Sequence, residues 1–276
     1  MPRLAPLTPD DRTDVQRFLL HPGGLHMYLE SRLDAPGEGE GLVYREGGRV
    51  LGFGWLGKGR NLVLAGDDPA FLGALADYAR GRDRDWVMLV GPWDPATDIL
   101  KQFTIATGRK PRLDRAQVYY AQTRKTLAKL EEPRLRPART EDLEELVPIS
   151  ARMSSEDFDL DFWRIDKSEV RRRIARKIQD ARSWILRDES RILFKVDVAA
   201  TTPGGAQIEG VYTAEDHRGR GIASRCMAEL GRRLMETTDL ITLHVAENNG
   251  AARKAYERSG YRPGDKLRLT IFPYVW

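Results

Sequence analysis

Two kinds of apolar pattern alternate along the whole chain. Asn61–Ala65 and Ala206–Thr213 are short apolar runs of strand length, whereas Pro69–Arg80 and Ile222–Glu236 repeat their apolar residues at helical spacing. A chain that alternates strands with helices builds neither a helical bundle nor an all-strand sandwich. The pattern therefore predicts an α/β fold with a mixed, α+β type of sheet.

The other expected elements fill both halves in the same way. In the first half we expect a helix toward Leu20, two strands over Gly41–Leu56, a strand at Trp86–Val90, a short helix, and a strand at Gln117–Ala121. In the second half we expect a strand at Arg134–Ala138, a helix capped at Thr140, a helix at Ser168–Asp180, strands at Ser183–Leu186, Ile192–Ala200 and Leu240–Val245, a helix at Ala251–Ser259, and a strand at Leu267–Phe272.

The length of 276 residues suits two domains, at about 100–200 residues each. Lys125–Pro133 is charged, weakly apolar and ends at a proline, as a linker does. We expect one domain at residues 1–128 and another at residues 134–276. The order of elements is similar in the two halves, which favours an internal duplication; two unrelated α/β domains are the alternative.

The composition favours a folded, cytoplasmic protein. Hydrophobic residues make up 41% of the chain and charged residues 31%, enough for a core, and no apolar stretch reaches the roughly 18 residues of a membrane span. Acidic residues at Asp10 and Asp11 argue against a signal peptide. A single cysteine, Cys226, and four scattered histidines give no spacing for a metal site, so we expect no metal.

The charge balance is weakly basic. The formal net charge is +4 and the pI is about 9.2, which is one mark of nucleic-acid binding. The densest basic run, at Arg171–Arg173, lies in a helical pattern close to Glu169 and Asp180. A solvated helix face explains this run better than a phosphate-binding patch, so we expect no nucleic-acid partner.

The most informative segment is the turn that follows the strand ending near Thr213. It carries Gly219 and Gly221 and leads directly into an amphipathic helix. The first turn of a helix leaves backbone N–H groups without internal partners, and the helix dipole is positive there. Glycines allow a ligand to come close to the backbone. Together these features predict an anion site suited to a diphosphate.

Two other phosphate loops are excluded by the same residues. The Walker pattern is absent, and the dinucleotide fingerprint needs a third glycine where Ser224 stands. A turn with two glycines before a helix is also a common structural feature. Its spacing alone leaves both interpretations open.

A second pattern follows about 25 residues later. A strand runs into Asn248 and Asn249, which can cap the next helix, and Gly260 can end it. On that helix Ala252 and Tyr256 are four residues apart and therefore share a face.

The two patterns together resemble those of the GNAT superfamily of acyl-CoA-dependent N-acyltransferases. Members carry Gln/Arg-x-x-Gly-x-Gly/Ala at the phosphate turn, which Arg218–Ala223 matches, and an asparagine, a small residue three later and a tyrosine seven later, which Asn249, Ala252 and Tyr256 match. The resemblance covers about residues 134–276 and is closest to bacterial proteins in which a diverged GNAT-like domain precedes a complete one. It implies two GNAT-like domains in tandem, the N-terminal one degenerate, with only a faint trace of the signature at Gly57–Arg60.

The resemblance implies how acetyl-CoA, the expected cosubstrate, binds. Backbone N–H groups from Gly219 to Ser224 would hold the diphosphate, and the strand at Val211 would pair with the pantetheine arm where two strands separate. The N–H of Val211 would stabilise charge on the thioester oxygen, and Asn249 would contact the arm. The implied coenzyme-binding residues are Val211, Tyr212, Thr213, Arg218, Gly219, Arg220, Gly221, Ile222, Ala223, Ser224, Asn249, Ala252 and Tyr256.

Two residues are candidates for proton transfer. Tyr256 would protonate the departing thiolate, although its spacing fits a purely packing role equally well. Glu209, expected on the same strand face as Gln207 and Val211, would accept a proton from the acceptor ammonium; a cross-strand salt bridge is the alternative. His244 is a weaker candidate base.

Three further features have mainly structural interpretations. His217 is expected to be an exposed loop residue, and Cys226 an inert core residue, which argues against a covalent route. Glu156–Trp163 mixes carboxylates with aromatic residues. It either attracts a cationic acceptor or begins a helix, with its acids near the positive end of the dipole.

The leading hypothesis is an N-acetyltransferase that moves an acetyl group from acetyl-CoA to a small-molecule or peptidyl primary amine by direct attack in a ternary complex. The alternative is a non-catalytic CoA-binding sensor or assembly module, and a basic nucleic-acid binder is a third hypothesis. We expect no membrane partner. The sequence allows a homodimer but identifies neither the acceptor nor the acyl chain length.

Overall fold

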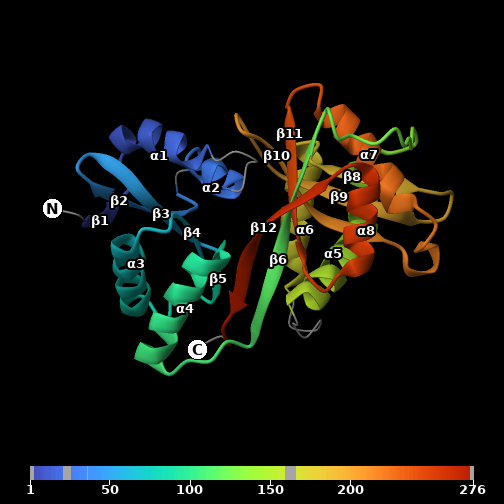
Figure 1. The fold of residues 1–276 in the computed structure, drawn as a ribbon. Coiled ribbons are helices and arrows are strands. Elements are labelled where there is room, and N and C mark those ends of the chain that lie inside the picture. The colour runs from blue at the N-terminus through green and yellow to red at the C-terminus, as the bar shows by residue number, and fades with distance from the viewer. Residues whose placement is uncertain (1–2, 21–25, 36, 159–165, 274–276) are drawn as a thin grey trace. The chain divides into compact units, whose positions relative to one another are not determined.

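The computed structural model describes residues 3–20, 26–35, 37–158 and 166–273 (Figure 1). Helices and a mixed sheet of parallel and antiparallel strands make this a mixed α/β fold, as the sequence predicts. Among these residues, no helix combines the length and the apolarity that crossing a bilayer requires.

The chain divides into two compact units. The first contains Met1–Tyr119 together with Gly264–Trp276, and the second contains Tyr120–Pro263. The last strand, β12 (Arg262–Ile271), pairs with β5 from Leu267 onward and so joins the sheet of the first unit. The boundaries predicted for two sequence domains, 1–128 and 134–276, concern likeness to a family and stay a prediction.

The first unit places helices on both faces of its sheet. Its elements are β1 (Arg3–Pro6), the 3₁₀ helix η1 (Pro9–Asp11), α1 (Arg12–Leu19), α2 (Met27–Arg32), β2 (Gly39–Glu46), β3 (Arg49–Gly57), β4 (Asn61–Ala65), α3 (Pro69–Gly81), β5 (Met88–Pro92), α4 (Trp93–Thr107) and the first part of β6 (Leu113–Thr123). The strand order is β1-β2-β3-β4-β5-β12-β6, with β4 and β5 parallel.

Side-chain alternation along β4 divides the core of the first unit into two layers. Leu62 and Leu64 pack on the face that α3 and α4 cover, whereas Val63 and Ala65 pack on the face of α1 and α2. A strand buried on both faces has little polar alternation, which explains why this segment is a continuous apolar run in the sequence.

The second unit holds the two sequence patterns. Its elements are β7 (Arg136–Pro137), the 3₁₀ helix η2 (Thr140–Asp142), α5 (Leu143–Phe158), α6 (Lys167–Gln179), β8 (Ser183–Arg187), β9 (Ile192–Thr202), β10 (Gly205–Thr213), η4 (Glu215–His217), α7 (Ile222–Leu234), β11 (Leu240–Ala246) and α8 (Gly250–Ser259). The strand order is β11-β10-β9-β8-β7, and only β10 and β11 are parallel among these neighbours.

Two groups of helices cover the sheet of the second unit. α5 and α6 form one apolar core with β8 and β9, which includes Leu146, Ile174 and Ile185. α7 buries Met227 and Leu230 and packs against β9 and β10, beside α8 (Figure 1). The strand that ends at Thr213 is therefore followed, after η4 and the glycine turn, by a helix packed on the same sheet.

Three sequence predictions differ from these elements. α4 extends from Trp93 to Thr107 and is not short. The strand expected at Arg134–Ala138 shortens to Arg136–Pro137, because prolines at 133 and 137 offer no N–H to a ladder. The helix start expected to be capped by Thr140 is held instead by the Asp142 carboxylate, which accepts a hydrogen bond from Arg139 N–H at 2.7 Å.

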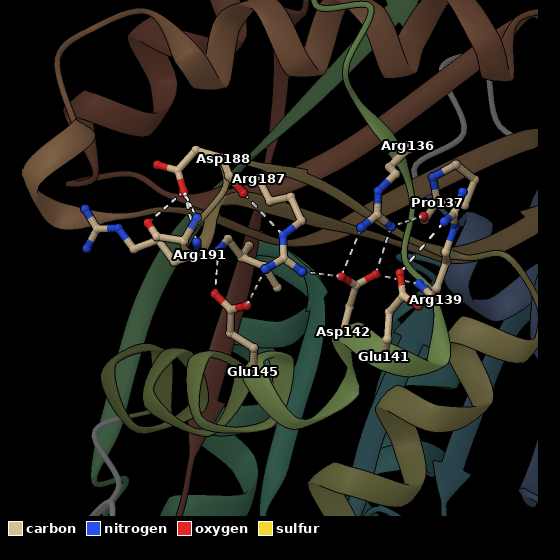
Figure 2. Close-up of polar contacts among 11 residues, drawn as sticks. Arg136, Pro137, Arg139, Glu141, Asp142, Glu145, Arg187, Asp188 and Arg191 are labelled. Atoms are coloured by element: carbon tan, nitrogen blue, oxygen red, sulfur yellow. Dashed lines mark hydrogen bonds and ion pairs between the residues drawn. The ribbon is translucent and has the colours of Figure 1, made fainter.

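Asp142 is the centre of a buried ionic cluster (Figure 2). Its side chain is 0% exposed and accepts a two-pronged contact from Arg136, at 2.8 and 3.0 Å, and a third contact from Arg187 at 3.1 Å. Burial alone raises the pKa of Asp142, but the hydrogen bonds from Arg136 and Arg139 outweigh it, so the pKa lies below its ordinary value. The cluster ties the start of α5 to β7 and β8.

Candidate functional site

The turn between β10 and α7 has the open backbone that its glycines predict. Gly219 and Gly221 have φ angles of +78° and +74°, in the left-handed region that favours glycine. A Cβ atom placed on Gly219 would meet no atom within 4 Å, so the space in front of the turn is open. Arg218 Nε and Arg225 Nη1 brace the turn by donating to the carbonyls of Thr213 and Arg220.

This turn presents a row of backbone donors. Within the described part of the chain, the six N–H groups from Gly219 to Ser224 have no hydrogen-bond acceptor, and the first helical bond runs from Arg225 N–H to Gly221 O at 3.1 Å. No side chain caps this helix. The donors therefore stand at the positive end of the α7 dipole, as an anion site requires. Coenzyme binding at these residues stays a prediction.

The two parallel strands beside the turn separate. Pairing between β10 and β11 covers three residue pairs and ends at Ile208 and Leu243. β10 continues to Thr213, paired only with β9 on its other side. Its edge toward β11 is consequently left open from Glu209 onward, over the residues that the sequence assigns to the pantetheine arm.

β10 also contains a bulge at the point of separation. Glu209 lies opposite Asp197 and Tyr212 lies opposite Lys195, so Gly210 and Val211 together face a single residue of β9. Gly210 has a φ angle of +61°, as the glycine of such a bulge does. The bulge interrupts the alternation of side chains along β10. The prediction that Glu209 and Val211 share one face of the strand is therefore wrong.

Tyr256 lies in a buried aromatic cluster. Its ring centroid is 6.2 Å from that of Tyr120 and 6.1 Å from that of Tyr261. Burial, and then the charge of Asp157, raise the pKa of Tyr256 above its ordinary value. The phenol therefore stays protonated at neutral pH, the form in which it can donate a proton.

The start of α8 agrees with the sequence. Asn249 is the N-cap, and its side chain accepts a hydrogen bond from Ala252 N–H at 3.1 Å. Gly260, with a φ angle of +103°, ends the helix. The cap uses the amide oxygen of Asn249 and leaves its NH₂ group for other contacts.

Glu209 forms the salt bridge that was its alternative interpretation, although with a helix and not across the strands. Its carboxylate is 2.5 Å from Lys177 Nζ, on α6, and its side chain is 43% exposed. Lys177 also contacts Asp197 at 2.8 Å. Burial alone lowers the pKa of Lys177, but the charges of Glu209 and Asp197 outweigh it, so the pKa lies above its ordinary value. The ammonium therefore stays charged beside Glu209.

The other titratable candidates have distinct surroundings. Cys226 is 0% exposed, so its predicted place in the core is confirmed, and burial raises the pKa of its thiol. The side chain of His217 is only 21% exposed and contacts Asp216 at 3.1 Å, so it is less exposed than expected. Burial lowers the pKa of His244 to about 4.

The partly buried His244 predicts a pH dependence of stability. Its pKa falls from 6.5 to about 4 on folding, so between these values the unfolded chain binds a proton that the folded chain does not. Stability is therefore full above pH 6.5 and falls by roughly 2 kcal/mol on going down to about pH 5. Urea unfolding at both pH values measures this loss, and His244→Leu should abolish it. An equal loss in the variant would assign the effect to other groups.

The acidic segment after residue 155 does not begin a helix. α5 extends to Phe158, so Glu156 and Asp157 lie in its last turn, where the dipole disfavours acids. This overturns the expected helix start for the part of Glu156–Trp163 that the structure describes; residues 159–165 lie outside it. The charge of Asp157 acts on Tyr256, which places this end of α5 near the candidate acid.

The corresponding strand-to-helix turn of the first unit is closed by a side chain. β4 leads through Gly66 to Asp68, whose carboxylate caps α3 by accepting from Ala70 and Phe71 N–H, both at 3.0 Å. A carboxylate there occupies the donors and repels an anion. The faint trace at Gly57–Arg60 is only the turn between β3 and β4 and precedes no helix.

Sequence reasoning missed the charged residues behind the bulge. Lys195 and Asp197, 1% and 2% exposed, are two apart in the apolar run of β9, and both side chains contact the bulge glycine region. Two opposite charges at alternate positions of an otherwise apolar strand are the signal that could have revealed them.

Comparisons with known proteins agree with this geometry. The model of the "Acetyltransferase (GNAT) family" matches residues 153–261. Among curated proteins, no relative matches the chain.

Solved structures match the chain over nearly its whole length. A GNAT acetyltransferase from Colwellia psychrerythraea is 14% identical with a TM-score of 0.58, over 99% of this chain and 100% of that one. A tandem GNAT protein from the clavulanic acid biosynthesis pathway is 18% identical with a TM-score of 0.58, over 99% and 98%. A GCN5-related N-acetyltransferase from Sphaerobacter thermophilus is 18% identical with a TM-score of 0.62, over 99% and 97%.

Such low identities show a shared fold and no more. The family match, however, spans the phosphate turn, the separating strands and Tyr256 in one domain. Residues 153–261 are therefore a domain of the GNAT acetyltransferase family.

Proposed function

We propose that this protein transfers an acetyl group from acetyl-CoA to a primary amine, by direct attack of the amine in a ternary complex. The observation that carries the proposal is the row of six open N–H groups from Gly219 to Ser224, beside the open edge of β10. The turn thus offers donors for a diphosphate, and β10 offers a strand edge for a peptide-like arm.

Each group of residues has its own role in binding the coenzyme. Gly219–Ser224 bind the diphosphate, and Val211–Thr213 pair with the pantetheine arm. Acetyl-CoA, when bound, supplies an activated thioester. Val211 N–H donates to the thioester oxygen, where negative charge develops as the amine attacks.

Proton transfer uses two groups at neutral pH. Tyr256, whose phenol carries its proton at neutral pH, donates to the departing sulfur. Glu209, kept beside the charged Lys177, receives the proton of the acceptor ammonium through water. His244 remains the second candidate base, and burial lowers its pKa to about 4.

The acceptor is a small-molecule or peptidyl amine. Glu156 and Asp157, at the end of α5 near Tyr256, favour a cationic group there. The first domain is proposed as a degenerate member of the tandem, because Asp68 occupies its helix N-terminus.

Replacing a glycine of the turn between β10 and α7 should weaken coenzyme binding without unfolding the protein. Gly221→Ala places a Cβ on a residue with φ +74°, next to the donors, and we expect CoA affinity to fall at least tenfold. Gly108→Ala is the control for the backbone strain, since Gly108 has a similar φ of +69° but lies outside the turn; a Cβ there meets no atom within 4 Å, whereas one on Gly221 lies 3.2 Å from Arg225 Nη1. Calorimetry with CoA measures the affinity of each variant.

The same preparation tests the reaction itself. Wild-type protein should bind CoA and release it from acetyl-CoA when a panel of amines is supplied. Binding without turnover on any amine would support the non-catalytic sensor or assembly module. No CoA binding at low salt would overturn the proposal altogether.

A further inference from the structure

The bulge of β10 is backed by a buried ionic network drawn from four elements. Asp197, on β9, accepts hydrogen bonds from Ser183 Oγ at 2.9 Å, from Lys195 Nζ at 2.7 Å and from Lys177 Nζ at 2.8 Å. Lys177 extends the network to Glu209 on β10. Burying such charges is costly unless each is paired, and here each is paired.

The network touches the bulge at one atom. Lys195 Nζ donates to the carbonyl oxygen of Gly210 at 3.2 Å. A Cβ on Gly210 would lie 2.9 Å from Lys195 Nζ and 3.2 Å from Asp197 Oδ2, so both side chains rest against this glycine. Lys195 is 1% exposed and cannot turn away into solvent.

The contact fixes the direction of a neighbouring donor. The carbonyl of Gly210 and the N–H of Val211 belong to one peptide plane, and this peptide is trans. In a trans peptide the two groups point in opposite directions. Because the Lys195 ammonium holds the Gly210 oxygen, the Val211 N–H points away from the network. The positive charge beside that oxygen also polarises the peptide, which strengthens the N–H as a donor.

We propose that Lys195, held by Asp197, is a positioning residue that orients and polarises the Val211 N–H toward the thioester oxygen. The inference rests on the proposed function and deepens it. Lys195 acts on the reaction through the Gly210–Val211 peptide and touches no reacting atom. Its loss should lower kcat more than it changes coenzyme affinity, by about 10- to 100-fold, because one oxyanion donor accounts for roughly 10²–10³ in rate.

A spectroscopic probe tests this without an acceptor. S-acetonyl-CoA, a ketone analogue labelled with ¹³C at its carbonyl, should show a downfield carbonyl shift on binding the wild type, as hydrogen-bonded ketones do. In Lys195→Met we expect most of that shift to disappear, with the dissociation constant changed less than about threefold. Asp197 keeps Lys177 and Ser183 in this variant, which limits the unpaired charge.

Two further variants complete the test. Lys195→Met with Asp197→Leu removes the central buried pair together, so it tests the same loss of shift should the single variant fail to fold. Arg136→Met disturbs another ion pair of the same unit and should keep the full shift. An unchanged shift without Lys195 overturns the inference alone. Failure of the wild type to bind the analogue or CoA overturns it together with the proposed function.

Discussion

Tyr256→Phe should lower the turnover of acetyl-CoA by about 100-fold or more while leaving CoA affinity close to that of the wild type. The phenol is buried and carries at neutral pH the proton that the departing thiolate needs. A positioned general acid contributes typically 10²–10⁴ in rate. Phenylalanine keeps the ring contacts with Tyr120 and Tyr261, so the loss should appear in kcat.

Tyr261→Phe is the matched control for this prediction. Tyr261 is 1% exposed, belongs to the same aromatic cluster, and also has a raised pKa. If the hydroxyl of Tyr256 is the acid, Tyr261→Phe should retain most of the turnover. Comparable rates in wild type and Tyr256→Phe would remove Tyr256 from the acid role and leave it a packing residue.

The phosphate turn could be predicted from the sequence because its cause is local. Gly219 and Gly221 stand between a strand pattern and an amphipathic helix, and the open N–H groups follow from the start of that helix. The same local logic predicted Asn249 as a cap. Short-range spacing is sufficient wherever a backbone conformation and its hydrogen bonds lie within one turn.

The features that sequence spacing did not predict depend on contacts between distant segments. Gly57–Arg60 has glycines at similar spacing, yet it joins two antiparallel strands, and only pairing between β3 and β4 reveals this. Glu156 was expected near the start of a helix, whereas α5 continues to Phe158 and places Glu156 in its last turn.

The bulge and its ionic network show the same limit in the site. Register against β9 decides that Gly210 and Val211 face one residue, and no spacing in β10 records that register. Lys177 reaches the network from α6, far away in the sequence. Open backbone donors could thus be predicted from local spacing, whereas contacts between distant side chains needed the fold.

The largest expected effect on stability is at Asp142. Asp142→Ala leaves Arg136 and Arg187 without the carboxylate that they share, and removing one partner of a buried ion pair costs about 3–5 kcal/mol. Both guanidinium groups are about a third exposed, so partial hydration should keep the loss near 3 kcal/mol. Urea unfolding followed by circular dichroism and tryptophan fluorescence measures it.

Glu141→Ala is the control for Asp142→Ala, because the neighbouring carboxylate is 66% exposed and lies 3.8 Å from Arg139. Exposed pairs of this kind contribute at most about 1 kcal/mol. Acid gives an independent test: the pKa of Asp142 lies below its ordinary 3.8, so its contribution is full above that pH and lost below it. Equal losses in the two variants at neutral pH would show that the cluster does not hold α5 to the sheet.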